Sequence, residues 1–189
     1  PLAARAGEGD AVHEDTVAAM QTKATRWSEL VASPEYQAAV HAADTWCATF
    51  VAPKTKTSAD ITHAEYHVAK TRPERADVFV RRTVAEMTDQ YGFLHWHLAF
   101  LDVFGGRGGF DVVLGNPPWE KVQFTEKEFF AVRAPEIANL GGAKRKAAIQ
   151  KLQADDPALW DAYEAALRQA EGESHFIRSS GRYPLCGRG

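Results

Sequence analysis

The sequence predicts an α/β fold, in which a mainly helical segment, residues 1–92, precedes a segment that contains strands, residues 93–189. Three observations lead to this prediction. Apolar residues recur at helical spacing between residues 16 and 51. A near-continuous apolar run at residues 110–114, Phe-Asp-Val-Val-Leu, is typical of a buried parallel strand. Helical patterns then return in the last third of the chain.

The helical segment is divided by residues that start and stop helices. Ser33 and Pro34 separate two helices, because serine caps a helix and proline suits its first turn. A further helix is predicted near residues 60–71. Pro73 is predicted to open another helix, which Gly92 ends.

The second segment begins with an aromatic-rich stretch at residues 93–104, FLHWHLAFLDVF, which is predicted to be extended. Residues 105–109, GGRGG, are predicted to be a flexible turn before the strand at residues 110–114. Residues 172–189 are predicted to be irregular. Helices are predicted near residues 125–131, 142–153 and 156–171.

Composition limits the classes of protein that fit. The 189 residues are 45% hydrophobic and 25% charged, which is typical of one ordinary globular domain. The net charge of −3 means that any contact with nucleic acid must come from a local basic patch or from another part of the protein. Cys47 and Cys186 are isolated and no stretch approaches a membrane span, so a cytoplasmic protein is expected.

The most informative residues are Asn116, Pro117, Pro118 and Trp119, which follow the predicted strand after Gly115. A residue before proline is held extended, and prolines donate no hydrogen bond to a sheet. The side-chain oxygen of Asn116 can accept a hydrogen bond from an amine. Trp119 offers a face on which a base can stack. The segment can therefore hold a flat ring that bears an amine, although a simple turn with Trp119 in the core is the alternative.

The stretch FDVVLGNPPWEKV resembles the catalytic motif of class I, S-adenosylmethionine-dependent amino-methyltransferases. HWHLAFLDVF, EKEFFAVRAPEIAN and EGESHFIRSSGRYPLCGRG resemble, more narrowly, the large adenine-specific DNA methyltransferases of type II and IIG restriction-modification and related phage-defence systems. The resemblance covers about residues 40–189. It implies a Rossmann-like sheet, with residues 1–92 as part of a helical insertion and residues 93–189 as an incomplete catalytic half.

The resemblance also implies roles for the motif residues. Asn116, through its side-chain oxygen, and Pro117, through its carbonyl, would accept hydrogen bonds from the N6 amine of the target adenine. Trp119 would stack on the adenine after it is flipped out of double-stranded DNA, and Pro118 would stiffen the segment. The methyl donor would be S-adenosylmethionine.

One departure from the family concerns the cofactor. The family binds S-adenosylmethionine with a strand, a Gly-x-Gly turn and a helix, whereas a predicted strand follows GGRGG at residues 105–109. No cofactor-binding residue can therefore be assigned. The chain is expected to be an internal fragment that needs the remainder of its own polypeptide, for the cofactor and for target recognition, and is inactive alone.

Basic residues are the candidates for contact with DNA phosphates. Arg81 and Arg82 belong to one basic stretch, and Lys144, Arg145 and Lys146 form a second. The alternative is that both stretches are solvated helix faces.

Histidine pairs provide no metal site by their spacing. His63 and His67 form His-x-Glu-x-His rather than the order found in zinc proteases. His95 and His97 are predicted to share one face of a strand with no carboxylate or cysteine pair nearby, so packing or a polar edge is the expected role. No metal is predicted.

Two other classes of function remain open. Enzymes that methylate RNA bases or a protein glutamine use the same motif, but they are usually compact, and the long helical segment argues against them. A non-catalytic helical binding module or remnant, with a structural Asn-Pro-Pro-Trp turn, is the alternative outside enzymes.

Overall fold

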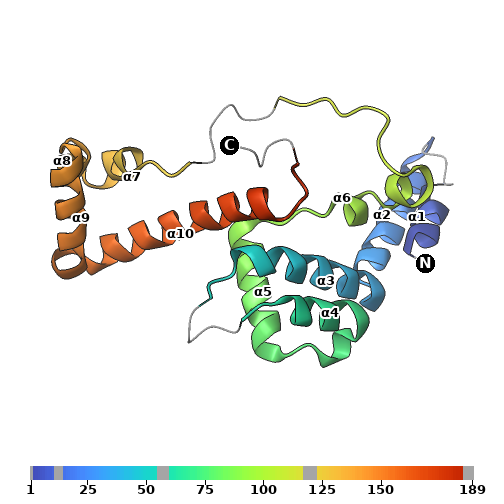
Figure 1. The fold of residues 1–189 in the computed structure, drawn as a ribbon. Helices are drawn as coiled ribbons and strands as arrows, with labels where there is room; N and C mark the ends of the chain where they lie inside the picture. The colour runs from blue at the N-terminus through green and yellow to red at the C-terminus, as the bar shows by residue number, and fades with distance from the viewer. Residues whose placement is uncertain (1, 11–14, 55–59, 117–122, 185–189) are drawn as a thin grey trace. The chain divides into compact units, whose positions relative to one another are not determined.

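The computed structural model describes residues 2–10, 15–54, 60–116 and 123–184. The chain divides into two compact units, Pro1–Pro117 and Pro118–Gly189, called unit 1 and unit 2 below. Every regular element in the described ranges is a helix or a helical turn (Figure 1). The predicted α/β fold with a Rossmann-like sheet is therefore wrong for the part of the chain that the structure describes.

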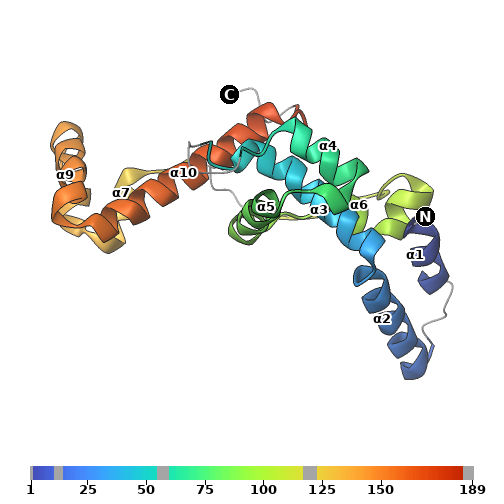
Figure 2. The same ribbon diagram turned by 90° about the horizontal axis from the view of Figure 1, so that it is seen from below.

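Unit 1 is built around one central helix, α3 (Pro34–Val51), which contacts α4 and α5 (Figure 2). Its contacting face buries Cys47, Ala48 and Val51, and the neighbouring helices bury Ala69 and Val84. The other elements of unit 1 are α1 (Leu2–Asp10), α2 (Val17–Val31), α4 (His63–Thr71), the 3-10 turn η1 (Pro73–Arg75), α5 (Val78–Tyr91), α6 (Trp96–Ala99) and the π-helical turn η2 (Val103–Arg107).

The predicted break between α2 and α3 is confirmed. The Ser33 hydroxyl accepts a hydrogen bond from the backbone N–H of Tyr36 at 3.4 Å, and Pro34 occupies the first turn of α3. The helix predicted near residues 60–71 begins at His63, where Thr62 and Glu65 form a capping box. The hydrogen bond from the Thr62 side chain lowers the pKa of the Glu65 carboxyl.

Pro73 opens only a short 3-10 turn, and a second signal starts the long helix. The Asp77 carboxylate accepts hydrogen bonds from the backbone N–H groups of Phe79 and Val80, at 2.8 and 3.3 Å, so α5 starts after Asp77. The predicted stop at Gly92 is confirmed, because this residue adopts the left-handed conformation with φ of 60°.

Residues 93–104 were predicted to be extended, but most of residues 96–104 are helical. Leu98 and Leu101 are both buried, and they stand three residues apart, which places them on one side of a helix. Trp96 and Phe100 stand four residues apart and stack, with ring centroids 5.5 Å apart. The aromatic composition favours a strand, but the spacing of the buried residues is that of a helix.

Residues 110–114 form neither a helix nor a strand. The side chains of Val112, Val113 and Leu114 are 71%, 74% and 91% exposed. A strand needs a neighbour to accept and donate its backbone hydrogen bonds, and the described residues supply none. The apolar composition alone therefore does not make this segment a buried strand.

Unit 2 has an aromatic core between α7 (Glu126–Arg133), the short α8 (Pro135–Ala138), α9 (Gly142–Asp155) and α10 (Pro157–Ser179). The three predicted helices of this unit are confirmed, and Asp156 caps α10 by accepting from the N–H of Leu159 at 3.0 Å. α10 continues to Ser179, through residues predicted to be irregular. The buried core residues are Phe129, Phe130, Ala134, Ile137, Ala138, Ile149, Leu152 and Tyr163.

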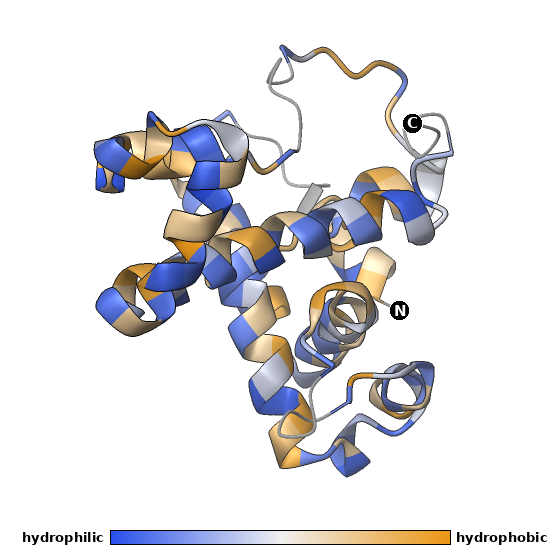
Figure 3. Ribbon diagram, turned by 60° about the vertical axis from the view of Figure 1, so that its left-hand side comes forward, coloured by the Kyte–Doolittle hydropathy of each residue, from blue (hydrophilic) through white to orange (hydrophobic). Residues whose placement is uncertain are grey.

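The helices carry hydrophilic and hydrophobic residues in alternation along their ribbons, as amphipathic helices do (Figure 3). Among the described residues, none of the helices combines the length and apolar character that crossing a membrane requires.

Candidate functional site

Residues 110–116, called the Asn116 arm below, lead to the predicted catalytic motif. Phe110 begins the arm and lies among three rings of unit 1. Its ring centroid is 6.0 Å from that of Trp96, 5.1 Å from that of Phe100 and 5.6 Å from that of Phe104, each in an edge-on arrangement. These contacts fix the start of the arm to the turn of chain that contains α6.

The rest of the arm projects from this anchor. Residues 111–116 are exposed, and Asn116 is the last residue before a range that the structure leaves undescribed. A Cβ atom added to Gly115 would have no neighbour within 4 Å, so the glycine faces open space. Pro117, Pro118 and Trp119 lie outside the described residues, and their predicted roles stay predictions. The structure thus places Asn116 at an exposed position.

The glycine-rich loop at residues 105–109 does not fit an S-adenosylmethionine site. A Cβ atom at Gly105 would lie 2.4 Å from the Cβ of Ala3, so this glycine permits the close approach of α1. Gly108 and Gly109 have φ of 80° and 153° and connect η2 to the Asn116 arm rather than to a helix. The loop therefore serves packing and a change of chain direction.

Three of the five predicted DNA-binding cations make contacts within their own unit. Arg81 donates to the carbonyls of Pro73 and Ala76, and its bond to Ala76 is 3.2 Å long. Arg82 pairs with Glu86 at 3.0 Å. Arg145 donates to the carbonyls of Ala138 and Leu140, at 3.3 and 2.8 Å. Lys144 and Lys146 are exposed on α9. No observation tests DNA binding by any of the five.

A buried polar pair joins α3 to the residue that precedes α6. His95 Nε2 lies 2.7 Å from Asp44 Oδ1, and the two side chains are only 5% and 11% exposed. The expectation that His95 lies on a strand without a nearby carboxylate is therefore wrong. Asp44 lies on the buried face of α3 with Cys47 and Val51. A carboxylate within that apolar face is the signal in the sequence that pointed to a buried partner.

A cavity of about 230 Å³ lies beside this pair, between α3 and α5. Its polar lining includes Gln37, His41, Asp44, Arg81 and Asp89. His41 Nε2 is buried without a hydrogen-bond partner among the described residues. Burial and, next, the Arg81 guanidinium hold the pKa of His41 below its ordinary value of 6.5, and Asp44 acts in the opposite direction.

The lowered pKa of His41 predicts a pH dependence of stability. The folded state favours neutral His41. The contribution of this residue to stability is therefore fully present above pH 6.5 and is lost as the pH falls through its lowered pKa. Urea unfolding between pH 7.5 and 5 is expected to show a free energy of unfolding that falls as the pH falls. His41→Gln is expected to make this pH dependence less steep. His63→Gln, at an exposed position on α4, is the control. An unchanged slope in His41→Gln contradicts the prediction.

Metal ligands do not gather in the described residues, where no group of three or more histidine, cysteine or acidic side chains is placed to hold an ion. His63 instead packs against the ring of Tyr66, with centroids 5.6 Å apart.

Comparison with known protein families gives a match over most of the chain. Residues 14–152 match the family model described as Eco57I restriction-modification methylase. The matched range is more than two thirds of the chain, and it includes the Asn116 arm and both basic stretches. Neither the curated proteins nor the solved structures contain a match to this chain.

Proposed function

The chain belongs to the Eco57I restriction-modification methylase family, and from this premise we propose that it carries the amine-binding motif of a DNA methyltransferase that modifies N6 of adenine. The family membership confirms the predicted resemblance to restriction-modification methyltransferases. The observation that carries the finer proposal is the Asn116 arm, which holds an asparagine amide at an exposed position directly before Pro-Pro-Trp.

The chemistry of the arm supports adenine as the substrate. The side-chain oxygen of Asn116 accepts a hydrogen bond from the exocyclic amine, and the Pro117 carbonyl accepts the second amine hydrogen. Two acceptors hold the amine in one orientation and draw its lone pair out of conjugation with the ring. Trp119 stacks on the flipped base, and Pro118 restricts the backbone between the two groups.

S-adenosylmethionine is the methyl donor in this proposal, because the reaction transfers a methyl group and the family is a methylase family. Neither the glycine-rich loop at residues 105–109 nor the described cavities provide the Gly-x-Gly turn before a helix that would hold it. The proposal therefore assigns cofactor binding to residues outside the described ranges. The family description supports restriction-modification as the setting. Phage defence is part of the proposal alone.

The test is the replacement of Asn116 in the protein that contains this chain. Asn116→Ala removes the acceptor oxygen and is expected to lower methyl transfer from tritiated S-adenosylmethionine to double-stranded DNA by about 100-fold or more. Asn116→Asp keeps an acceptor oxygen at the same position and is expected to retain part of the activity. Circular dichroism should show equal helix content in both variants, since Asn116 is exposed.

Product analysis separates the proposal from its alternatives. Digestion of the methylated DNA to nucleosides and mass spectrometry are expected to give N6-methyladenine. Methylated cytosine, or methyl transfer to RNA or protein but not to DNA, contradicts the adenine proposal. Unchanged activity in Asn116→Ala contradicts the assigned role of the arm.

A further inference from the structure

A groove in unit 1 is lined by residues of α1, of α2, of α6 and of the chain that follows α6. Its volume is about 470 Å³, which is within the usual size of pockets for small ligands. Its apolar lining residues are Ala6, Met20, Ala24, Trp27, Leu30 and Ala99.

Trp27 is the large flat side chain of this lining, and the surrounding contacts hold it in place. Its ring meets that of Tyr36 edge-on, with centroids 6.1 Å apart. The Tyr36 hydroxyl donates a hydrogen bond to the carbonyl of Leu98 at 3.3 Å, which ties α3 to α6. Trp27 remains 40% exposed, so a fixed indole is open to solvent at the groove.

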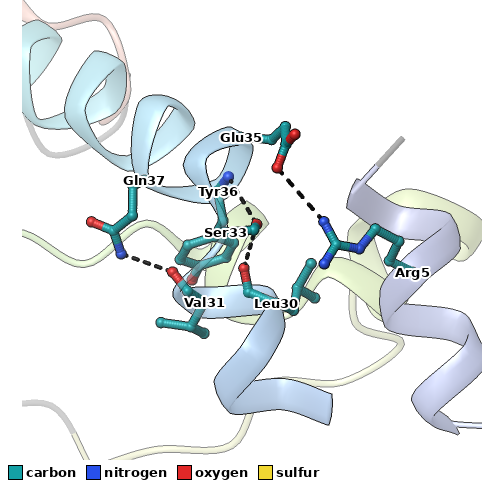
Figure 4. A network of polar contacts seen from close by, with 7 residues as sticks. All are labelled: Arg5, Leu30, Val31, Ser33, Glu35, Tyr36 and Gln37. Carbon is teal, nitrogen blue, oxygen red and sulfur yellow. Dashed lines mark hydrogen bonds and ion pairs between the residues drawn. The ribbon is translucent and has the colours of Figure 1, made fainter.

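The polar lining of the groove is mainly cationic, although the chain as a whole has a net charge of −3. Arg5, Lys23 and Arg26 line it together with one carboxylate, that of Asp102. Arg5 also reaches Glu35 at the start of α3, at 3.7 Å, and so links α1 to the capped end of that helix (Figure 4). At the same junction, the Gln37 side chain donates a hydrogen bond to the carbonyl of Val31, and the Ser33 hydroxyl donates one to the carbonyl of Leu30 (Figure 4).

We propose that this groove binds one unpaired nucleotide of a DNA strand. The base stacks on Trp27 against the apolar lining, and the neighbouring phosphates contact Arg5, Lys23 and Arg26. An unpaired nucleotide is required because stacking on an indole needs a base face that duplex neighbours do not cover. The three cations favour a nucleic acid over an apolar helix of a partner protein. The choice of DNA rests on the proposed function.

The experiment measures fluorescence anisotropy of labelled DNA with the intact protein. One oligonucleotide is single-stranded, and one is a fully paired duplex of the same sequence. Trp27→Ala is expected to weaken single-strand binding by about 5- to 100-fold, whereas Trp27→Phe retains most of the affinity. Lys23→Gln is expected to reduce the slope of log affinity against log salt by about 0.7. Lys54→Gln removes an exposed charge outside the groove and is the control.

The outcomes separate this inference from its rivals. Unchanged single-strand affinity in Trp27→Ala and Lys23→Gln overturns it. Adenosine monophosphate that binds with the same dependence on Trp27, without any effect on oligonucleotide affinity, assigns the groove to a free nucleotide and also overturns it. A change of oligomeric state in Trp27→Ala, seen by sedimentation, would make the groove a protein interface. Thermal melting of Trp27→Phe and Lys23→Gln shows whether the fold is retained.

Failure of the proposed function gives a different pattern. If both proposals hold, Lys54→Gln, at an exposed position outside the groove, is expected to keep wild-type methyl transfer and wild-type single-strand affinity. If even the wild-type protein transfers no methyl group but single-strand binding still depends on Trp27, the groove inference stands and the proposed function fails.

Discussion

Phe130→Ala is expected to lower the free energy of unfolding of unit 2 by about 3–5 kcal/mol. The Phe130 side chain is fully buried and packs between the rings of Phe129 and Tyr163, with centroids 5.0 and 5.4 Å away. Alanine leaves a cavity that α7 and α10 cannot close without losing the remaining aromatic contacts. Urea unfolding, followed by hydrogen exchange of peptides from α7 and α10, measures the loss in this unit.

Val132 provides the control on the same helix. Its side chain is 85% exposed, so Val132→Ala is expected to change stability by no more than about 0.5 kcal/mol. Equal effects of Phe130→Ala and Val132→Ala would mean that the aromatic cluster is not the core that stabilises unit 2. Exchange in α3 and α5 should be unchanged in both variants if the two units unfold independently.

The helices were predictable because their signals are local. Ser33 followed by Pro34, and Asp156 followed by Pro157, mark helix starts, and the structure has α3 and α10 beginning there. Gly92 supplies the left-handed residue that ends α5. Capping and proline act within a single turn, so the identity of a few consecutive residues is enough to locate a boundary.

The predicted sheet failed because a strand depends on residues elsewhere. Val112 to Leu114 have the composition of a buried strand, but pairing requires a second segment at the correct distance, which composition cannot supply. At residues 93–104 the misleading property was aromatic content. The spacing of Leu98 and Leu101 contained the correct helical signal.

The candidate site at Asn116 rests on the same kind of local signal and stays a prediction. Asn116 is recognised by its immediate neighbours in sequence, and the structure describes it as exposed. The basic residues show the limit of such reasoning, because Arg81 and Arg145 bind backbone carbonyls of their own units. A basic side chain that donates hydrogen bonds to the carbonyls at a helix end cannot be distinguished, in the sequence, from one that binds phosphate. Trp27 lies within the helical pattern of residues 16–51, but its groove could not be predicted from that pattern, because α1, α6 and the chain after α6 complete the lining.

The buried Asp44–His95 pair is expected to contribute more to the free energy of unfolding than an exposed polar contact does. Asp44→Ala is expected to lower the free energy of unfolding of unit 1 by about 3 kcal/mol, because His95 then stays buried with no partner for Nε2. His95→Ala is expected to cost a similar amount. In the double variant the loss is smaller than the sum, since neither group is left unpaired.

The exposed Arg82–Glu86 pair on α5 is the matched comparison, because it joins opposite charges at 3.0 Å in the same unit. Its side chains are 77% and 56% exposed, so Glu86→Ala is expected to cost no more than about 1 kcal/mol. Hydrogen exchange in α6 should also rise in Asp44→Ala but not in Glu86→Ala, since the Asp44–His95 pair holds the residue before that helix. Because α6 and the following turn anchor Phe110, the proposed function also predicts that loosening them lowers methyl transfer. Equal costs for Asp44→Ala and Glu86→Ala would show that the Asp44–His95 contact does not fix α6 to α3.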